Sequence, residues 1–485
     1  GKLILLYDKN NITIAGDTAT NFNDDIATRF IAQGWQVIRV PDANDMNVLK
    51  TAIERAKSDL TRPSIIICTT KIGYGCPLEG SEKVHGAPMG EENLAKLKER
   101  LNWTEEPFDV PEDVKEYCRA IAEEKSLDEE NWNKLFEDYA TVYPELADKY
   151  KKYMSGYELD YNELFSKFDF SSPEATRASG GKILNEIATR TPNLLSGSAD
   201  LAPSTLTGLK CSGAFTPENR EGRNIQFGIR EHAMAAICNG IQVHGGLRIV
   251  CSTFFSFSDY MKGGIRMSAL MKAPVIYVMT HDSIGVGEDG PTHQPMEQLI
   301  ALRSIPDIKV FRPCDGKETV AAYVSAFTGT APTVLVLSRQ NLNQYANSGI
   351  KAITGGYVLE DCKGTPDVIL MGTGSEVDLC AAAKKALEDE GIKARVVSML
   401  CLEEFENQTE EYQESVLPKS VKARVCVEAA SHFAWYKYSR DYGEVIAMHS
   451  FGTSAPAKVA FEHFGFTVDN VVEKAKLSLS NSKKK

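Results

Sequence analysis

Short apolar runs alternate with longer amphipathic stretches along most of the chain. In the first part, the runs at 3–7, 35–40 and 64–69 have the length of buried strands, and the stretches at 25–33 and 47–59 have helical spacing. Strands that alternate with helices in this way predict a parallel sheet with crossover helices. The alternation recurs at 175–338 and from about residue 355 onward. We therefore expect an α/β protein with three parallel-sheet units.

The same pattern places the elements of the second and third units. Helices are expected at 175–190, from 231 and at 377–390, and strands at 194–197, 224–229, 248–252, 274–279, 308–311, 333–337, 367–371, 394–398 and 423–427. Residues 111–167 break the alternation, because they are charged, aromatic and helical without a strand pattern. The expected domains are residues 1–110, a helical connector at 111–170, residues 171–348 and residues 349–485. The first domain opens directly on a strand, so we expect it to be incomplete and to expose a sheet edge.

Composition excludes several classes of protein. A chain of 485 residues with 43% hydrophobic residues can bury more than one core. Its 54 basic and 66 acidic residues give a net charge of −12, which argues against a nucleic-acid footprint. The apolar runs are too short to span a membrane. Its eleven cysteines form no Cys-x-x-Cys pair, so we expect reduced thiols in a cytoplasmic protein.

The densest chemistry lies in the segment Thr280–Pro295. It contains two histidines, His281 and His293, and three carboxylates, and it directly follows the apolar run Pro274–Met279. Ligands of open parallel sheets bind outside the carboxyl ends of the strands. This loop is therefore expected to form part of a site.

Other motifs leave two interpretations open. Glu231 opens a helix, where a carboxylate can serve chemistry or simply favour the helix dipole. The aromatics of Thr253–Tyr260 suit a core or a ligand platform. The turn in Tyr7–Ile14 can ligate a hard cation or be held by Asx hydrogen bonds. Gly372–Ser375 can cradle an anion. His432, His449 and His463 are expected to sit singly.

Together these segments resemble the transketolases, thiamine-diphosphate enzymes of the pentose phosphate pathway, over essentially the whole chain. The motifs that carry the resemblance are Ser81–Pro88, Gly197–Ser204, Gly228–Met234, Thr280–Pro295 and Leu337–Leu342. The resemblance implies three α/β units of the thiamine-diphosphate-binding fold, of which the first binds the diphosphate and the second the pyrimidine.

The resemblance also implies a cofactor site. Glu231 would hydrogen-bond the pyrimidine ring and promote the tautomer that deprotonates the thiazolium carbon. Asn10, through its side chain, and Ile12, through its carbonyl, would bind Mg²⁺ or Ca²⁺. The remaining cofactor contacts would come from Phe254, which would stack on the pyrimidine, and from Phe257, Tyr260, Asp200 and His85.

The implied substrates are sugar phosphates. Arg guanidiniums match phosphate geometry, and imidazoles move protons near neutral pH. The resemblance assigns the phosphate to Arg177, Ser204, His281 and Arg339, the hydroxyl beside the ketose carbonyl to Asp289, and other sugar oxygens to His85 and His293. Glu231, His293 and His85 would serve catalysis. A two-carbon ketol unit would pass from a ketose phosphate to an aldose phosphate, at a site shared by two subunits of a homodimer.

The chain departs from the family pattern in one respect. The family's Gly-Asp-Gly segment, whose aspartate is a third magnesium ligand, precedes the opening strand and is absent from the sequence. We therefore expect weak cofactor binding and little turnover by this chain alone. A fragment, a split enzyme completed by another chain, and a truncated non-catalytic partner of a transketolase all stay open. Ketol transfer to formaldehyde, as in dihydroxyacetone synthase, is the alternative activity.

Overall fold

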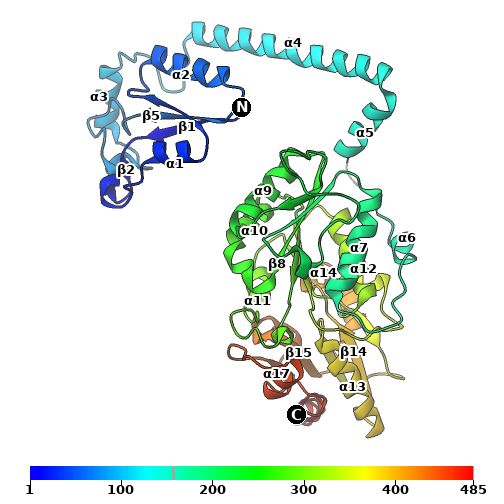
Figure 1. Ribbon diagram of the computed structural model, residues 1–485. Helices are drawn as coiled ribbons and strands as arrows, with labels where there is room; N and C mark the ends of the chain where they lie inside the picture. Colours follow the sequence, from blue (N-terminus) through cyan, green and yellow to red (C-terminus); the bar gives the residue numbers. More distant parts are fainter. Residues whose placement is uncertain (156–158, 484–485) are drawn as a thin grey trace. The chain divides into compact units, whose positions relative to one another are not determined.

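Three sheets organise the protein, as the alternating pattern predicts. The computed structural model describes residues 1–155 and 159–483, and they divide into two units, 1–135 and 136–485 (Figure 1). The first unit contains one parallel sheet, of three strands, and the second unit contains the other two. No helix within the described part of the chain has both the length and the apolar character needed to cross a membrane.

The sheet of the first unit has the order β1-β5-β4 and helices on both faces. The strands and the helices that cover them are β1 (Ile4–Lys9), α1 (Ile26–Ala32), β4 (Gln36–Val40), α2 (Met46–Ser58) and β5 (Ser64–Thr69). The first unit also contains the hairpin of β2 (Ile12–Thr13) and β3 (Gly16–Asp17) and helix α3 (Glu91–Arg100). Ile66 packs on the α2 side and Ile65 on the α1 side, because neighbouring strand residues face opposite ways. Leu6 on the edge strand β1 is 50% exposed.

Helices follow where the sequence predicts a connector. They are α4 (Glu112–Val142), α5 (Pro144–Met154) and α6 (Tyr161–Phe165). Helix α4 buries none of its residues. Part of the expected connector, residues 156–158, lies outside the described residues.

The second sheet is wholly parallel, with strand order β10-β11-β9-β8-β6-β7. Its strands are β6 (Leu194–Ser198), β7 (Asn224–Gln226), β8 (Arg248–Phe254), β9 (Ile276–Thr280), β10 (Lys309–Phe311) and β11 (Thr333–Leu337). Its helices are α7 (Thr176–Arg190), α8 (Ala202–Thr205), α9 (Glu231–His244), α10 (Lys262–Leu270), α11 (Gln298–Arg303) and α12 (Gly316–Thr328). Strand β7 is shorter than predicted because Gly228, at φ +67°, turns the chain toward α9.

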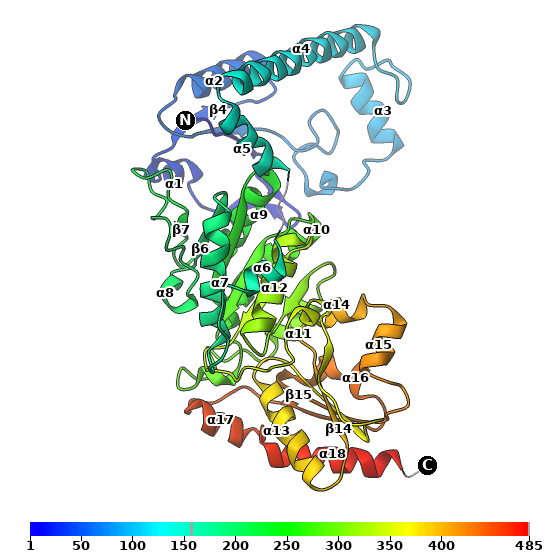
Figure 2. The same ribbon diagram turned by 90° about the vertical axis from the view of Figure 1, so that its right-hand side faces the viewer.

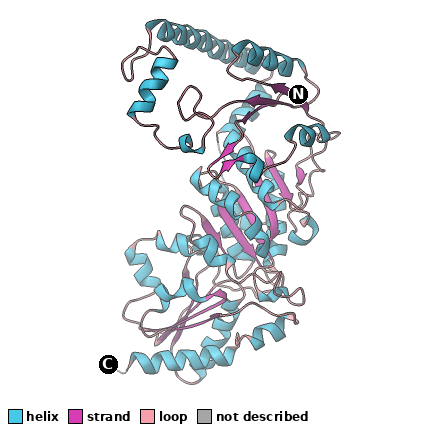
Figure 3. Cartoon of the chain, turned by 90° about the vertical axis from the view of Figure 1, so that its left-hand side faces the viewer, coloured by secondary structure: helices cyan, strands magenta, loops and turns pink. Residues whose placement is uncertain are grey.

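The third sheet has the order β12-β14-β13-β15-β16. Its elements are β12 (Tyr357–Glu360), β13 (Val368–Gly372), α13 (Glu376–Asp389), β14 (Ala394–Ser398), α14 (Leu402–Glu406), α15 (Glu410–Val416), β15 (Ala423–Ser431), α16 (Tyr436–Ser439), β16 (Glu444–Met448), α17 (Ala457–His463) and α18 (Val468–Ser482). The pattern missed edge strand β12, which is antiparallel to β14. Helices α13 and α18 lie together along one face of this sheet (Figure 2), and Figure 3 shows its strands as a group separate from those of the second sheet.

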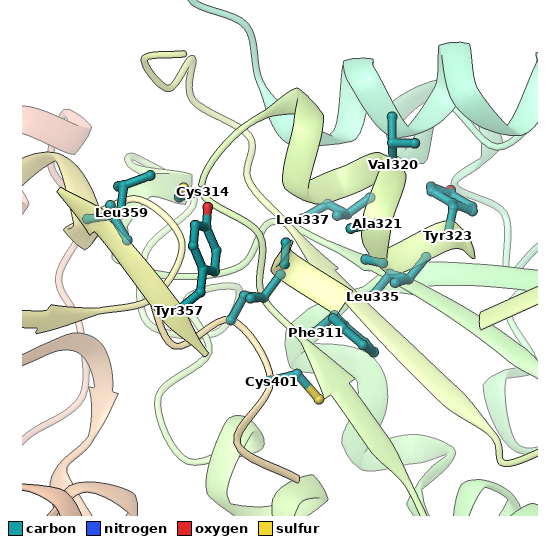
Figure 4. Packing of buried hydrophobic residues seen from close by; sticks show 14 of the residues in the cluster. Phe311, Cys314, Val320, Ala321, Tyr323, Leu335, Leu337, Tyr357, Leu359 and Cys401 are labelled. Atoms are coloured by element: carbon teal, nitrogen blue, oxygen red, sulfur yellow. The ribbon is translucent and has the colours of Figure 1, made fainter. Parts of the chain in front are cut away.

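One hydrophobic cluster joins the second and third sheets. Leu335 and Leu337 of β11 belong to it together with Tyr357 and Leu359 of β12 (Figure 4). Helix α12 adds Val320, Ala321 and Tyr323 to the same cluster, and this helix is buried along almost its whole length. The second and third sheets therefore pack on one shared hydrophobic core and belong to the same unit.

A buried carboxylate also links these two sheets. Glu318 of α12 accepts hydrogen bonds from the Tyr357 hydroxyl of β12 (2.9 Å) and from the Ser398 hydroxyl of β14 (2.6 Å). Burial, together with the nearby Asp315 carboxylate, raises the pKa of Glu318 from 4.5 to about 7. A carboxyl group whose pKa is raised by folding stabilises the folded state when the pH lies below its ordinary pKa. This stabilisation is lost as the pH rises through the pKa that the group has in the folded state.

We expect the free energy of unfolding of the native chain to fall between pH 4.5 and pH 7. At about 1.4 kcal/mol per pKa unit, the Glu318 contribution is on the order of 3 kcal/mol. The Glu318→Gln variant should lose most of this slope, because a glutamine does not titrate. Urea unfolding at several pH values from 5 to 8 measures the slope, with the exposed Glu218→Gln as control. Equal slopes in Glu318→Gln and the native chain would contradict this assignment.

Candidate active site

The carboxyl ends of the second sheet bring the predicted side chains together. All six strands run in the same direction, so these ends meet at one edge. The predicted residues that follow them are Asp200 and Ser204 after β6, Glu231 after β7, Phe254, Phe257 and Tyr260 at the end of β8, His281 after β9 and Arg339 after β11. Arg177 joins this edge from the start of α7, where its backbone N–H donates to the Ser338 carbonyl (3.4 Å).

An aromatic and imidazole cluster forms the centre of this edge. The ring of Phe254 stacks on that of His281 with 3.7 Å between centroids. The ring centroid of Phe257 lies 5.9 Å from that of Phe254 and 5.3 Å from that of His293, with which it makes an edge-to-face contact. Phe254 is buried, whereas Tyr260 is 66% exposed. The four rings of Phe254, Phe257, His281 and His293 therefore make one wall, and both the core and the platform interpretation of this segment stay open.

Two guanidiniums and one imidazole share a positive environment. Burial, followed by the charges of Arg177 and Arg339, lowers the pKa of His281 to about 3. Burial and Arg339 also lower the pKa of Arg177. The Arg177 Nη1 donates to the Ser204 carbonyl at 2.6 Å, which fixes its direction. Cations held this close without a counter-charge between them favour the binding of an anion such as phosphate.

Glu231 is a buried carboxylate at the start of α9. It is 8% exposed, and its carboxylate makes no hydrogen bond to another side chain among the described residues. Its oxygens are not among the fully buried polar atoms that lack a partner, so water or a ligand can reach them. The position is therefore open to a heterocycle that offers an N–H, as the thiamine pyrimidine does. The helix-dipole interpretation of this carboxylate stays open as well.

Asp200 and His281 share a backbone feature. Both are non-glycine residues in the left-handed region, with φ of +62° and +65°. Such a conformation costs on the order of 1 kcal/mol or more and persists where the surrounding structure holds it. The Thr280 hydroxyl lies 2.9 Å from the His281 Nδ1 and fixes that ring further.

Asp289 and His293 belong to the loop that follows β9. Asp289 is exposed and His293 is half-buried. The Thr292 hydroxyl lies 2.9 Å from the His293 Nδ1. The loop thus keeps both predicted groups accessible beside the aromatic wall.

The predicted residues of the first unit lie at the carboxyl end of β1. The Asn10 side-chain oxygen accepts the Ile12 N–H at 2.9 Å, so the Asx turn exists. Asn10 and Ile12 both line a hollow of about 920 Å³ that Asp8 and Asp17 also border. An amide oxygen has a second lone pair and can still bind a hard cation. His85 is exposed and is not among the residues that line this hollow.

Two further binding possibilities are a cluster of metal-binding side chains and an anion at the Gly372–Ser375 turn. In residues 1–155 and 159–483, no group of three or more His, Cys, Asp or Glu side chains could hold a metal ion. The sequence left open that the Gly372–Ser375 turn cradles an anion, but the Arg312 guanidinium occupies it. Its Nη1 donates to the Thr373 carbonyl at 3.0 Å. A Cβ at Gly374 would come within 2.8 Å of the guanidinium, so this turn is built around a cation.

One further expectation needs correction, and one residue of interest was missed. His432 and His449 do not sit singly, because their rings lie 4.7 Å apart. Sequence reasoning also missed Arg312, which turns out to contact Asp282 in the predicted loop. The available signal was a lone arginine after the apolar run at 308–311, at the same sheet edge as the other site residues.

Comparisons with known proteins identify the family of this chain. Residues 1–158 match the transketolase thiamine diphosphate binding domain, residues 172–344 the transketolase pyrimidine binding domain, and residues 355–467 the transketolase-like C-terminal domain. The three matches together cover most of the chain. The chain belongs to the transketolase family. The domain limits proposed from the sequence of this transketolase-family chain stay a prediction, and the first match, 1–158, includes most of the expected connector at 111–170.

Individual relatives support the same family. A transketolase of Halalkalibacterium halodurans is 45% identical, over 99% of this chain and 73% of the relative. The crystal structure of a Pichia stipitis transketolase with sedoheptulose 7-phosphate has a TM-score of 0.93 and 39% identity, over 100% of this chain and 72% of that one. A structure described as a split gene transketolase, an inactive β4 tetramer, has a TM-score of 0.51 and 26% identity, and 64% of this chain covers all of it.

We expect His281 to remain uncharged across the neutral range. Its pKa of about 3 means that its NMR signals should not titrate between pH 5 and pH 8. Addition of inorganic phosphate should raise this pKa, because the anion offsets the charges of Arg177 and Arg339. Histidine NMR, with His281→Asn to assign the signal and the exposed His244 as internal reference, tests both points. A His281 signal with a midpoint near 6.5 in the phosphate-free chain would contradict the expectation.

Proposed function

We propose that the protein transfers a two-carbon ketol unit from a ketose phosphate to an aldose phosphate, with thiamine diphosphate and Mg²⁺ or Ca²⁺ as cofactors, in the pentose phosphate pathway. The observation that carries the proposal is the buried Glu231 at the same sheet edge as the aromatic wall and the cluster of Arg177, His281 and Arg339. The family membership supports the reaction type.

The residues at this sheet edge would bind different parts of the cofactor and the substrate. Thiamine diphosphate, when bound, supplies the electron sink that cleavage of a carbon–carbon bond beside a carbonyl needs. Glu231 would accept a hydrogen bond from the pyrimidine ring and hold it in register. The stacked ring of Phe254 would form the wall of this pocket, with Phe257 and Tyr260. Asp200 would complete the cofactor contacts at this edge, and His85, in the first unit, is the other cofactor contact that the proposal includes.

Substrate binding depends on charge and hydrogen bonding. Arg177 and Arg339 would bind the phosphate, and His281, kept neutral by its surroundings, would add a hydrogen bond without a further charge. Ser204 would add a polar contact. Asp289 would accept a hydrogen bond from the hydroxyl next to the ketose carbonyl. His293 and His85 would donate to other sugar oxygens and move protons near neutral pH.

The cation would bind beside the diphosphate. Asn10, through its side-chain oxygen, and Ile12, through its carbonyl, are the donors of this chain, and both line the hollow in the first unit. Oxygen donors of this kind suit Mg²⁺ or Ca²⁺. We therefore expect cofactor binding to depend on the cation. Calorimetric titration with thiamine diphosphate, with and without Mg²⁺, measures it.

Assembly and location are part of the proposal. The aromatic residues Tyr260, Phe433, Tyr436 and Phe451 are each more than half exposed, which favours a partner packed on them, and the partner we propose is a second copy that forms a homodimer. All eleven cysteines are free, and eight of them are buried, which favours a reducing compartment such as the cytoplasm.

We expect Glu231→Gln to lower ketol transfer by at least about 100-fold, because an amide cannot replace the charged acceptor at the pyrimidine. It should also weaken thiamine diphosphate binding, which calorimetry detects even if turnover is low. The assay couples a ketose phosphate with ribose 5-phosphate, and with formaldehyde in a second arm. Glu473→Gln, an exposed change on α18, is the control. Unchanged cofactor affinity and transfer in Glu231→Gln would refute the role.

A further inference from the structure

The residue after His281 connects the site to a buried ion network. Asp282 is 2% exposed, and its Oδ2 accepts two hydrogen bonds from Arg312, from Nε at 3.0 Å and from Nη2 at 2.7 Å. Arg312 itself is completely buried and directly follows β10. Two bonds to one carboxylate fix both its position and its direction.

The other side of the Arg312 guanidinium is held by the third sheet. Its Nη1 donates to the Thr373 hydroxyl at 2.9 Å, and it forms an ion pair with Glu376 at the start of α13. The Glu376 Oε2 also accepts the Ala429 N–H of β15 at 2.9 Å. Arg312 is therefore clamped between the predicted substrate loop and two elements of the third sheet.

A second buried pair supports the first. Arg303 donates two hydrogen bonds to Glu428 of β15, both at 2.9 Å. The Glu428 carboxylate also accepts from the Thr373 hydroxyl (2.7 Å) and from the Trp435 indole (2.9 Å). Because Thr373 contacts both Arg312 and Glu428, the two pairs form one continuous network.

A separate set of contacts holds the far part of the loop. The Gln294 amide donates to the Gly287 carbonyl within the loop (2.8 Å) and to the Thr453 carbonyl beyond β16 (2.9 Å). The Ser454 hydroxyl donates to the Glu288 carbonyl at 2.6 Å. These bonds are adjacent in sequence to His293 and Asp289. Residues 449–456, here called the strap, thus tie the loop to the third sheet at a second point.

Stability alone gives a weak reason for so many buried charges. The cost of removing charged groups from water largely offsets their attraction, so such networks often add little net stability. The backbone of His281 is strained, and a strained residue keeps its conformation only when its neighbours hold it. The network ends on the residue next to this strained histidine.

We propose that the third sheet positions the substrate loop, with Arg312 and Glu376 as positioning residues for His281 and Ser454 as a positioning residue for Asp289. The inference rests on the proposed function, in which these loop residues face the sugar phosphate. It assigns a role in substrate recognition to residues 355–485, beyond packing.

The decisive variant is Glu376→Gln. Glutamine keeps the size and an acceptor for Arg312 and for the Ala429 N–H but removes one charge from the clamp. We expect the KM for a phosphorylated ketose to rise about tenfold or more, with a smaller change in kcat, whereas the KM for a short unphosphorylated ketol donor stays within about twofold. The dissociation constant for inorganic phosphate should rise by a similar factor, and the His281 NMR signal should shift.

Glu318→Gln is the matched control. Glu318 is as buried as Glu376 and joins the same two sheets, but it bonds Tyr357 and Ser398 and does not touch the loop. We expect it to alter stability and to leave phosphate affinity and the His281 signal near their native values. If Glu376→Gln changes only stability, or if both variants weaken phosphate binding equally, the network is merely structural and the proposal is wrong.

The strap is tested independently by Ser454→Ala. Loss of its bond to the Glu288 carbonyl should raise the KM for the ketose donor about two- to fivefold, with little change in melting temperature, because Ser454 is exposed. Ser450→Ala is its control, since that hydroxyl bonds only its neighbour's carbonyl, at 3.3 Å. Equal KM values in the two variants would remove the strap from the proposal.

The phosphate and NMR measurements need neither cofactor nor turnover. If the native chain transfers no ketol unit but Glu376→Gln alone shifts the His281 signal and weakens phosphate binding, the proposed function fails and the positioning role holds. If the native chain is active and Glu376→Gln behaves like the native chain, the proposed function holds and the positioning role fails.

Discussion

The uniform direction of the strands in the second sheet is the constraint on which the site depends. Each strand returns through a helix, so every carboxyl end reaches the same edge. Glu231, Phe254, His281 and Arg339 are far apart in the chain and meet for this reason alone. A single antiparallel strand in the middle of the sheet would send its residues to the opposite edge. The common strand direction thus places these residues at one edge of the sheet.

Electrostatics at this edge is arranged in two opposite ways. Around His281 neither Arg177 nor Arg339 forms an ion pair with a described carboxylate, and burial together with these two charges lowers the pKa of the imidazole. A few residues away, the Arg312 cation is fully compensated by Asp282 and Glu376. Exposed unpaired charge favours binding, and buried paired charge favours a fixed geometry. The loop 281–294 contributes to both environments, through His281 to the first and through Asp282 to the second.

Much of the architecture could be predicted from the chain. The strands at 64–69, 333–337 and 394–398 occur at the predicted limits, because continuous β-branched and apolar runs bounded by polar turns have few other outcomes. The limits were less accurate where a local turn overrides the pattern, as at Gly228. Strand β12 was missed, because a short edge strand alternates weakly and is antiparallel. The merging of the second and third sheets through α12 could not be read from periodicity, since it depends on contacts between distant residues.

By itself the sequence determined the α/β class, the order of the elements and the motifs that resemble the transketolases, because these depend on local periodicity and on residue types at short spacing. Only the tertiary structure decided that Glu231 is buried, that His281 is strained and neutral, and that Arg312 fills the glycine turn at 372–375. Burial, backbone conformation and charge compensation are properties of contacts made across the fold. They arise only when the sheet edges bring those residues together.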